Sequence, residues 1–311
     1  MGGRSIRSPI SLDTKGNLRM KLNKRRLKAT AFVVPAFLLH AAIVGIPALS
    51  LVFYAFTEWN GIGTPKFNGV ENFRYMIIED SDFHAALGNN LIYMAIFLTA
   101  PLVVGLLMAL LTMRAGRFQM LYRALFFLPF VVSPVVAGRI FMIYYDPFVG
   151  ITQFFKSVGW DSLADIMFIG NRSIALFSVA FVDYWHWWGF VMVIFLAGLH
   201  QVDRGLYEAA MLDGANSFQR FAHVTIPQLR PTIVTLAMIT VIGSFLTFDY
   251  IYVMTQGGPA GATEIASTWI YKQAFTLFNA GYASSLSFAV CLACVLVYIG
   301  FRQIQKRGWD V

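Results

Sequence analysis

Carboxylate side chains stand beside aromatic rings within two long apolar stretches of this chain. Asp249 is followed directly by Tyr250, and Asp183 precedes the run Tyr184, Trp185, His186, Trp187 and Trp188. A sugar presents an apolar CH face and a ring of hydroxyl groups, so a site for it combines aromatic faces with hydrogen-bonding groups. Asp183 with Trp185 or Trp188, and Asp249 with Tyr250 or Phe245, have this chemistry. Lipid contact and helix packing are the alternatives, since neighbouring tryptophans cannot all face one cavity.

Ionisable groups inside apolar stretches are costly in a bilayer and are typical of functional sites. At ~1.5 Å per helical residue, Arg139 lies ~24 Å into its stretch and Asp249 ~26 Å into its own, which predicts a similar depth for both. Two interpretations follow: an ion pair that fixes helix packing, or two groups that line a substrate path. We expect His186 to be a packed neutral histidine rather than a proton relay.

The composition requires a bilayer as the main solvent. Of 311 residues, 58% are hydrophobic and 13% charged, and 29 are Phe, which is more apolar surface than a soluble domain can bury. Crossing a bilayer takes about 20 apolar residues per helix. This predicts an all-α, polytopic membrane protein with six transmembrane helices, at 29–56, 88–113, 123–145, 174–199, 232–254 and 284–304.

The distribution of basic residues predicts the orientation. Nine of the 24 Lys and Arg residues lie between Arg4 and Lys28. With that segment inside, 18 basic residues fall on the inner side and five on the outer side. We therefore expect both termini in the cytoplasm, a basic segment at 1–28, and one membrane domain at 29–311 that includes a cytoplasmic loop at 200–231. The net charge of +8 thus concerns topology, and we expect no nucleic-acid partner.

Two further features bear on processing and cysteine chemistry. The apolar run 29–56 is longer than the apolar core of a cleaved signal peptide, which predicts an uncleaved first span. Cys291 and Cys294 lie one helical turn apart in the last span, where we expect helix-packing residues rather than a disulfide or a metal site.

The loop at 200–231 has more structure than a simple turn requires. Asp203 is a suitable N-cap for a helix over 204–212, and Gly214 can form a left-handed turn at its end. A second short helix is expected over 217–223, before Pro227. Two helices that meet at a glycine predict a compact projection with exposed apolar contacts, although an ordinary interfacial loop remains the alternative.

The loop also resembles a known family motif. The family pattern has EAA, then a Gly after three residues, and two apolar residues and a Pro further on; the chain matches it with Glu208-Ala209-Ala210, Gly214, Val224, Ile226 and Pro227. This is the signature of bacterial ABC-importer permeases. The segment Phe248 to Pro259, ending Gly257-Gly258-Pro259, is similar to the end of the fifth span in carbohydrate-importer permeases, and Phe56-Thr57-Glu58-Trp59-Asn60-Gly61 is similar to the first permease of such pairs. The resemblance covers residues 29–311.

The resemblance implies a coupling loop that docks on a separate ATPase. Glu208, Ala209, Ala210, Asp213, Gly214 and Pro227 would form the docking surface. Within it, Glu208 would pair with a basic residue of the ATPase, while Asp213 would either take part in docking or cap the second helix. The implied partners are a second permease, a dimer of ATPase subunits, an extracytoplasmic solute-binding protein and the lipids of a bacterial inner membrane.

The same resemblance implies a translocation subunit with no catalytic residues, no metal and no cofactor of its own. The chain has no G-x-x-x-x-G-K-[ST] sequence, so Mg-ATP would bind to the partner. An ion-coupled secondary transporter using Asp183 and Asp249, or an intramembrane enzyme, is the alternative function. The sequence does not support the enzyme alternative, because neither the H-E-x-x-H nor the G-x-S-x-G motif occurs in it. The residue pattern does not identify the carbohydrate.

Overall fold

The fold is known from a computed structural model that describes residues 33–306, and these residues are almost entirely helical. The chain divides into two compact units, Met1–Phe53 and Tyr54–Val311. Five helices are long and apolar enough to cross a membrane, and a sharply bent helix pair adds a sixth crossing if its two parts are counted together. The five helices are Val33–Ala55, Ser81–Arg114, Ala175–His200, Arg230–Met254 and Ala280–Gln305. The expected all-α polytopic fold is therefore confirmed.

The first unit is a single helix within the described residues. It contains a π-helical turn, η1 (Ala41–Gly45), followed by α2 (Ile46–Ala55). None of residues 33–53 is buried, and apolar side chains such as Leu49 are exposed. Such a surface needs lipid or another chain to cover it. The predicted basic segment 1–28 lies outside the described residues.

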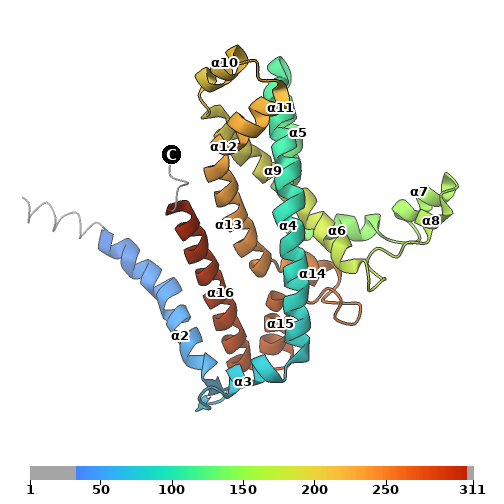
Figure 1. The fold of residues 1–311 in the computed structure, drawn as a ribbon. Coiled ribbons are helices and arrows are strands. Elements are labelled where there is room, and N and C mark those ends of the chain that lie inside the picture. The colour runs from blue at the N-terminus through green and yellow to red at the C-terminus, as the bar shows by residue number, and fades with distance from the viewer. Residues whose placement is uncertain (1–32, 307–311) are drawn as a thin grey trace, which may run out of the picture. The chain divides into compact units, whose positions relative to one another are not determined.

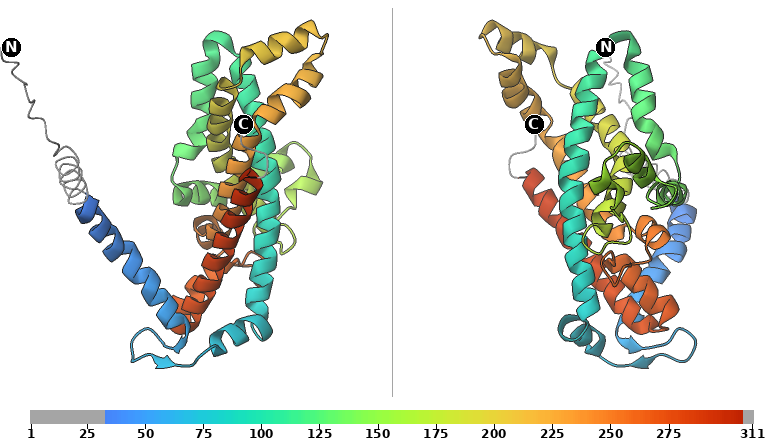
Figure 2. Two further views of the ribbon diagram at one scale, coloured as in Figure 1. Left: turned by 60° about the vertical axis from the view of Figure 1, so that its left-hand side comes forward. Right: turned by 90° about the vertical axis from the view of Figure 1, so that its right-hand side faces the viewer.

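The second unit is a bundle built around α4 (Ser81–Arg114) and α9 (Ala175–His200), which pack along each other (Figures 1 and 2). Helix α5 (Gln119–Val131) packs on α9 at Gly189, where an added Cβ would lie 2.5 Å from the Phe126 carbonyl oxygen. Only a residue without a side chain allows this approach, a common device in membrane bundles. Helices α13 (Arg230–Leu246) and α16 (Ala280–Lys306) complete the bundle.

Short elements gather at the two ends of this bundle, which we name the loop end and the α3 end (Figure 1). The loop end has α10 (Arg204–Leu212), α11 (Ser217–Arg220), η3 (Phe221–Thr225), α12 (Ile226–Gln228) and, before α5, η2 (Gly116–Phe118). The α3 end has the antiparallel pair β1 (Thr57–Glu58) and β2 (Lys66–Phe67), with Thr57 opposite Phe67, and α3 (Glu71–Ile78). The remaining elements follow the two broken spans: α6 (Pro134–Tyr144), α7 (Ile151–Ser157), α8 (Asp161–Ala164), α14 (Asp249–Met254), α15 (Ala266–Tyr271) and η4 (Lys272–Thr276).

Two predicted spans are not continuous helices, which corrects the sequence interpretation. The span expected at 123–145 bends by 90° between α5 and α6. Val132 and Ser133 both leave helical geometry there, and Pro134, which starts the new helix, disfavours that geometry in Ser133 directly before it. The span expected at 232–254 breaks at Thr247 and Phe248 before α14. The second span was also predicted too short, since α4 begins at Ser81 with Asp80 as its N-cap.

Candidate functional site

The first helix of the loop between α9 and α13 forms where the residue pattern predicts it, as α10. Asp203 accepts a hydrogen bond from the Gly205 amide at 2.9 Å and so caps α10. Glu208 and Ala209 are exposed on this helix, and Ala210 is half-buried. Glu208 is therefore free to meet a partner from outside the chain.

Gly214 makes the predicted left-handed turn, with φ of +79°. The second helical stretch runs further than expected, since α11 continues without a break through the π-helical turn η3 into α12 and so includes Pro227 instead of ending before it. Asn216 caps α11 in a capping box. The Asn216 side chain accepts a hydrogen bond from the Gln219 backbone amide at 2.9 Å, and the Gln219 side chain accepts one from the Asn216 backbone amide at 2.8 Å. Asp213 does not cap this helix, because it lies three residues before the capping position; its docking role stays a prediction.

One side-chain contact joins two parts of the loop, and Pro227 lies where the loop meets the bundle. The Tyr207 hydroxyl lies 2.9 Å from the buried hydroxyl of Thr225, which joins α10 to η3. Pro227 is half-buried and lines a hollow of about 180 Å³ with Gly198 and Thr232, at the junction of the loop with α9 and α13. The loop therefore meets both long helices at Pro227 and the residues around it.

Large apolar side chains on this loop face away from the rest of the chain. Leu212 is 90% exposed and Phe218 is 76% exposed, and Met211 is also exposed. Exposed apolar groups on a compact projection are typical of a surface that another protein covers.

A second polar centre lies inside the bundle around Asp183, which is 8% exposed. Its Oδ2 accepts hydrogen bonds from the Tyr93 hydroxyl at 2.7 Å and from the Thr247 hydroxyl at 3.5 Å. These three residues belong to α9, α4 and the break after α13. The contact joins three spans at one carboxylate and leaves Oδ1 without a hydrogen bond from the described residues.

The two span breaks expose backbone carbonyls that side chains then satisfy. His186 Nε2 donates to the Val132 carbonyl at 2.8 Å, so this ring is a packed hydrogen-bond donor, as expected. The buried Asn90 donates to the Ser244 carbonyl at 2.9 Å and accepts from the Ala266 amide at 2.8 Å. Broken helices in a bilayer persist only where such partners exist. Discontinuous helices of this kind commonly line transport sites.

Of the predicted aromatic residues, Tyr250 and Trp185 pack in the apolar cluster that contains Tyr93, whereas Trp188 is not part of it. Tyr250 is 4% exposed, packs against the His186 ring, and its hydroxyl is buried without a partner. Trp185 packs edge-on against Phe141 with ring centroids 5.2 Å apart, and Trp188 against Tyr184 at 5.5 Å. The buried Nε1 of Trp188 is also unpartnered. Tyr250 therefore brings a hydroxyl to this cluster that no described residue bonds.

The structure does not bring the other predicted path residues into this cluster. Phe245 packs with a different apolar cluster, which includes Trp269 and Tyr282. Arg139 and Asp249 are both exposed, and they do not form an ion pair. The depth estimate assumed straight helices, whereas both residues follow a break. Their part in a substrate path stays a prediction, while the proposed pair between them is absent here.

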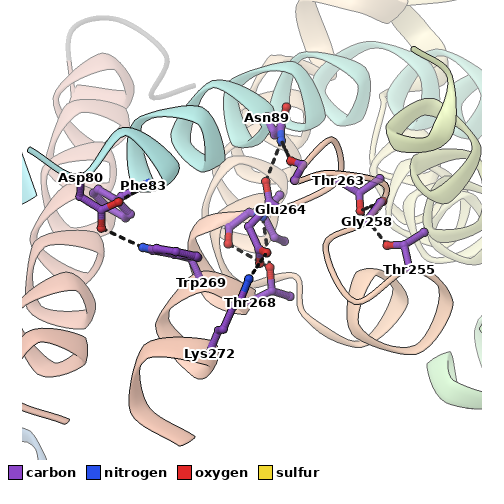
Figure 3. Close-up of polar contacts among 12 residues, drawn as sticks. Asp80, Phe83, Asn89, Thr255, Gly258, Thr263, Glu264, Thr268, Trp269 and Lys272 are labelled. Carbon is purple, nitrogen blue, oxygen red and sulfur yellow. Dashed lines mark hydrogen bonds and ion pairs between the residues drawn. The ribbon is translucent and has the colours of Figure 1, made fainter. Parts of the chain in front are cut away.

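Figure 3 shows a polar network toward the α3 end, where the segment after α14 meets the first turns of α4. Asp80 accepts from Trp269 Nε1 at 2.9 Å, and Asn89 donates to the Glu264 carbonyl at 2.8 Å (Figure 3). The Glu264 carboxylate lies 3.9 Å from Lys272 Nζ. Burial raises the pKa of Glu264, which the Thr268 hydrogen bond and the Lys272 charge partly offset.

Sequence reasoning missed three residues of the interior centre: Tyr93, Thr247 and Asn90. Asn90 is a polar residue within an apolar stretch, a signal that was present in the sequence. Tyr93 and Thr247 offer no such signal, because their role depends on contacts between spans far apart in sequence. Among residues 33–306, no group of three or more His, Cys, Asp or Glu side chains is placed to hold a metal ion.

Comparison with known proteins agrees with this architecture. The family described as the binding-protein-dependent transport system inner membrane component matches residues 101–309. The chain is 33% identical over 291 residues to the probable ABC transporter permease protein YurN of Bacillus subtilis, covering 92% of this chain and 99% of that protein. It is 31% identical to the probable starch degradation products transport system permease protein AmyD of Thermoanaerobacterium thermosulfurigenes, covering 89% and 93%.

A solved structure has the same fold. A bacterial ABC transporter that imports the acidic polysaccharide alginate contains a chain that superposes with a TM-score of 0.81, at 20% identity, covering 93% of this chain and 98% of that one. The chain therefore belongs to the family of binding-protein-dependent transport system inner membrane components, and it is a permease subunit of an ABC transporter rather than an enzyme.

Proposed function

We propose that this chain is the sugar-conducting permease of an ATP-driven importer in a bacterial inner membrane. It would form the path with a second permease, receive sugar from an extracytoplasmic binding protein, and be driven by two copies of an ATPase that binds Mg-ATP. The loop end would then lie in the cytoplasm together with both termini. The observation that supports this most is the projecting α10–α11 loop, with Glu208, Leu212 and Phe218 exposed and without partners inside the chain.

The proposal gives α10 and α11 a mechanical role. ATP binding closes the ATPase dimer and moves the docked loop, and the short connections at Pro227 and Thr225 pass this movement to α9 and α13. Both helices reach the Asp183 centre, since Asp183 lies on α9 and Thr247 directly follows α13. Movement of α13 relative to α9 would therefore change the Asp183–Thr247 contact, which is the longer of the two bonds at 3.5 Å.

The proposed substrate class is a di- or oligosaccharide or a glycoside. The Asp183 centre has a carboxylate oxygen that no described residue bonds, and the Tyr93 and Tyr250 rings pack there, which is chemistry suited to sugar hydroxyls and CH faces. The similarity to AmyD supports the same class.

The test is uptake of a labelled carbohydrate panel by cells with and without this chain, its partner genes being present in both. We expect uptake of at least one saccharide to require the chain and to stop when cellular ATP is depleted. Uptake that follows an ion gradient and persists without ATP would instead identify a secondary transporter. A panel in which no carbohydrate depends on the chain would reject the substrate class.

A further inference from the structure

The turn between α10 and α11 encloses a hollow of about 290 Å³ on the projecting loop. Its lining includes Ala210, Asp213 and Gly214 from the first helix and its turn, and Gln219, Arg220 and His223 from the second. The left-handed Gly214 opens the angle between the two helices, and no atom lies within 4 Å of where its Cβ would be. The hollow is therefore a product of the same turn that shapes the loop.

Arg220 is the one cation of this hollow other than a histidine, and its own hydrogen bonding is incomplete. Its Nη2 donates to the Ser217 hydroxyl at 3.2 Å, but its Nε is buried and has no partner. The described part of the chain offers no carboxylate in ion-pair range, although Asp213 lines the same hollow. A buried donor without an acceptor costs free energy that a partner can recover.

We propose that Arg220 is a second charged anchor of the coupling loop, and that it receives a side-chain carboxylate of the ATPase subunit in this hollow. This inference rests on the proposed function. A guanidinium offers a fork of N–H donors that matches a carboxylate, and Nε is part of that fork. A phosphate group fits less well, because it has about two negative charges and would face Asp213 at close range.

The neighbouring side chains favour such a contact. Phe218 lies two residues before Arg220, is 76% exposed and is not part of the lining of the hollow, so it offers a docked partner a separate apolar contact on the same short helix. Glu208 on α10 presents the opposite charge. Two contacts of opposite sign on one small loop define the orientation in which the partner docks.

The experiment compares variants of the complete importer, with its second permease, ATPase and binding protein, in proteoliposomes. ATP-driven sugar uptake and the amount of ATPase that co-purifies are both measured. We expect Arg220→Glu to lower uptake about tenfold or more and to weaken co-purification, because two carboxylates would then meet. Arg220→Lys should keep part of the activity, since it retains the charge but not the fork.

Two control variants separate docking from other effects. Arg204→Glu reverses an exposed charge at the start of α10, outside the hollow, and should transport normally. Ser217→Ala removes only the internal bond of Arg220 and should also transport normally. Restoration of uptake in Arg220→Glu by an acid-to-base substitution in the ATPase groove would identify the partner carboxylate directly.

The results that overturn the inference are distinct from those that overturn the proposed function. If Glu208→Lys loses uptake while Arg220→Glu resembles Arg204→Glu, the loop docks but Arg220 has no partner carboxylate. If Ser217→Ala is as impaired as Arg220→Glu, Arg220 only shapes the loop. If neither Glu208→Lys nor Arg220→Glu affects uptake, the docking function itself is wrong.

Discussion

At the scale of single residues, Asp183 is the group on which the interior centre depends. Its Oδ2 is the common acceptor for Tyr93 and Thr247. Asp183→Asn replaces the carboxylate by a weaker acceptor at the same size, and hydrogen bonds to charged groups contribute about 1.5–3 kcal/mol each. We expect sugar uptake to fall about tenfold or more while the protein remains in the membrane with its ATPase.

Tyr93→Phe tests the same contact from the donor side, and Tyr145→Phe is its matched control. Tyr145 also has a buried hydroxyl, which donates to the Ser178 carbonyl at 3.2 Å away from Asp183. We expect lower uptake for Tyr93→Phe and near-normal uptake for Tyr145→Phe. Equal losses in both variants would show that any buried hydroxyl has this effect and would remove Tyr93 from the site.

Glu264 makes a prediction about pH. Burial raises its pKa in the folded protein above the ordinary value of about 4.3. Between the unfolded and folded pKa values the folded state binds more protons than the unfolded state, so stability falls as pH rises through that window. Thermal unfolding in detergent should therefore occur at a higher temperature as pH is lowered toward the ordinary pKa of a glutamate. Glu264→Gln should flatten this dependence, and an unchanged pH profile in that variant would contradict the assignment.

At the scale of elements, the α10–α11 loop carries an exposed charge, that of Glu208, which can be reversed without removing a contact that folds the loop. Glu208 is exposed and takes part in none of the caps or turns described above. We expect Glu208→Lys to abolish coupling, with normal insertion but little ATP-driven uptake, and Glu208→Gln to have an intermediate effect. Uptake and ATPase co-purification are measured together, and normal values for Glu208→Lys would exclude the docking role.

The bend between α5 and α6 makes a prediction about stability. His186→Leu would leave the Val132 carbonyl unpaired inside the bundle, at a cost of about 1–3 kcal/mol. His84→Leu is the control, because His84 also bonds a backbone carbonyl, that of Met76 at 3.0 Å, but at an exposed position where water can replace it. The temperature of thermal unfolding should fall clearly for His186→Leu and change little for His84→Leu. Similar shifts would mean that His186 acts through packing alone.

The elements that sequence reasoning predicted well are those set by neighbouring residues. Asp203 and Gly214 act within a few positions of where they stand, so the first helix of the loop and its turn were predicted, whereas the helical stretch that runs through Pro227 was not. The span breaks were missed because average apolarity is the same on both sides of Val132 and Thr247. The pairing of Tyr93 with Asp183 was missed because it depends on how α4 and α9 pack, which no short segment determines.

At the scale of the whole molecule, the surfaces left open are as informative as the core. The described part of the first unit has no buried residue, and Arg139 and Asp249 are exposed after the two span breaks. Exposed charges in or beside a bilayer require a polar partner or an aqueous path. A second permease placed against the exposed charges would provide polar partners for them and enclose an aqueous path, which agrees with a path shared between two chains.

Because these surfaces need other subunits, we expect the chain to be inactive by itself. Vesicles that contain only this polypeptide should neither hydrolyse ATP nor accumulate sugar, because its sequence has no phosphate-binding loop and its coupling loop has nothing to dock on. Addition of the second permease and the ATPase should give ATP-dependent uptake that needs the binding protein, and the same vesicles with Glu208→Lys are the matched control. Imposing a proton or sodium gradient on vesicles with the chain alone tests the alternative. If sugar accumulates there without nucleotide, Asp183 couples transport to an ion and the chain works as a carrier on its own.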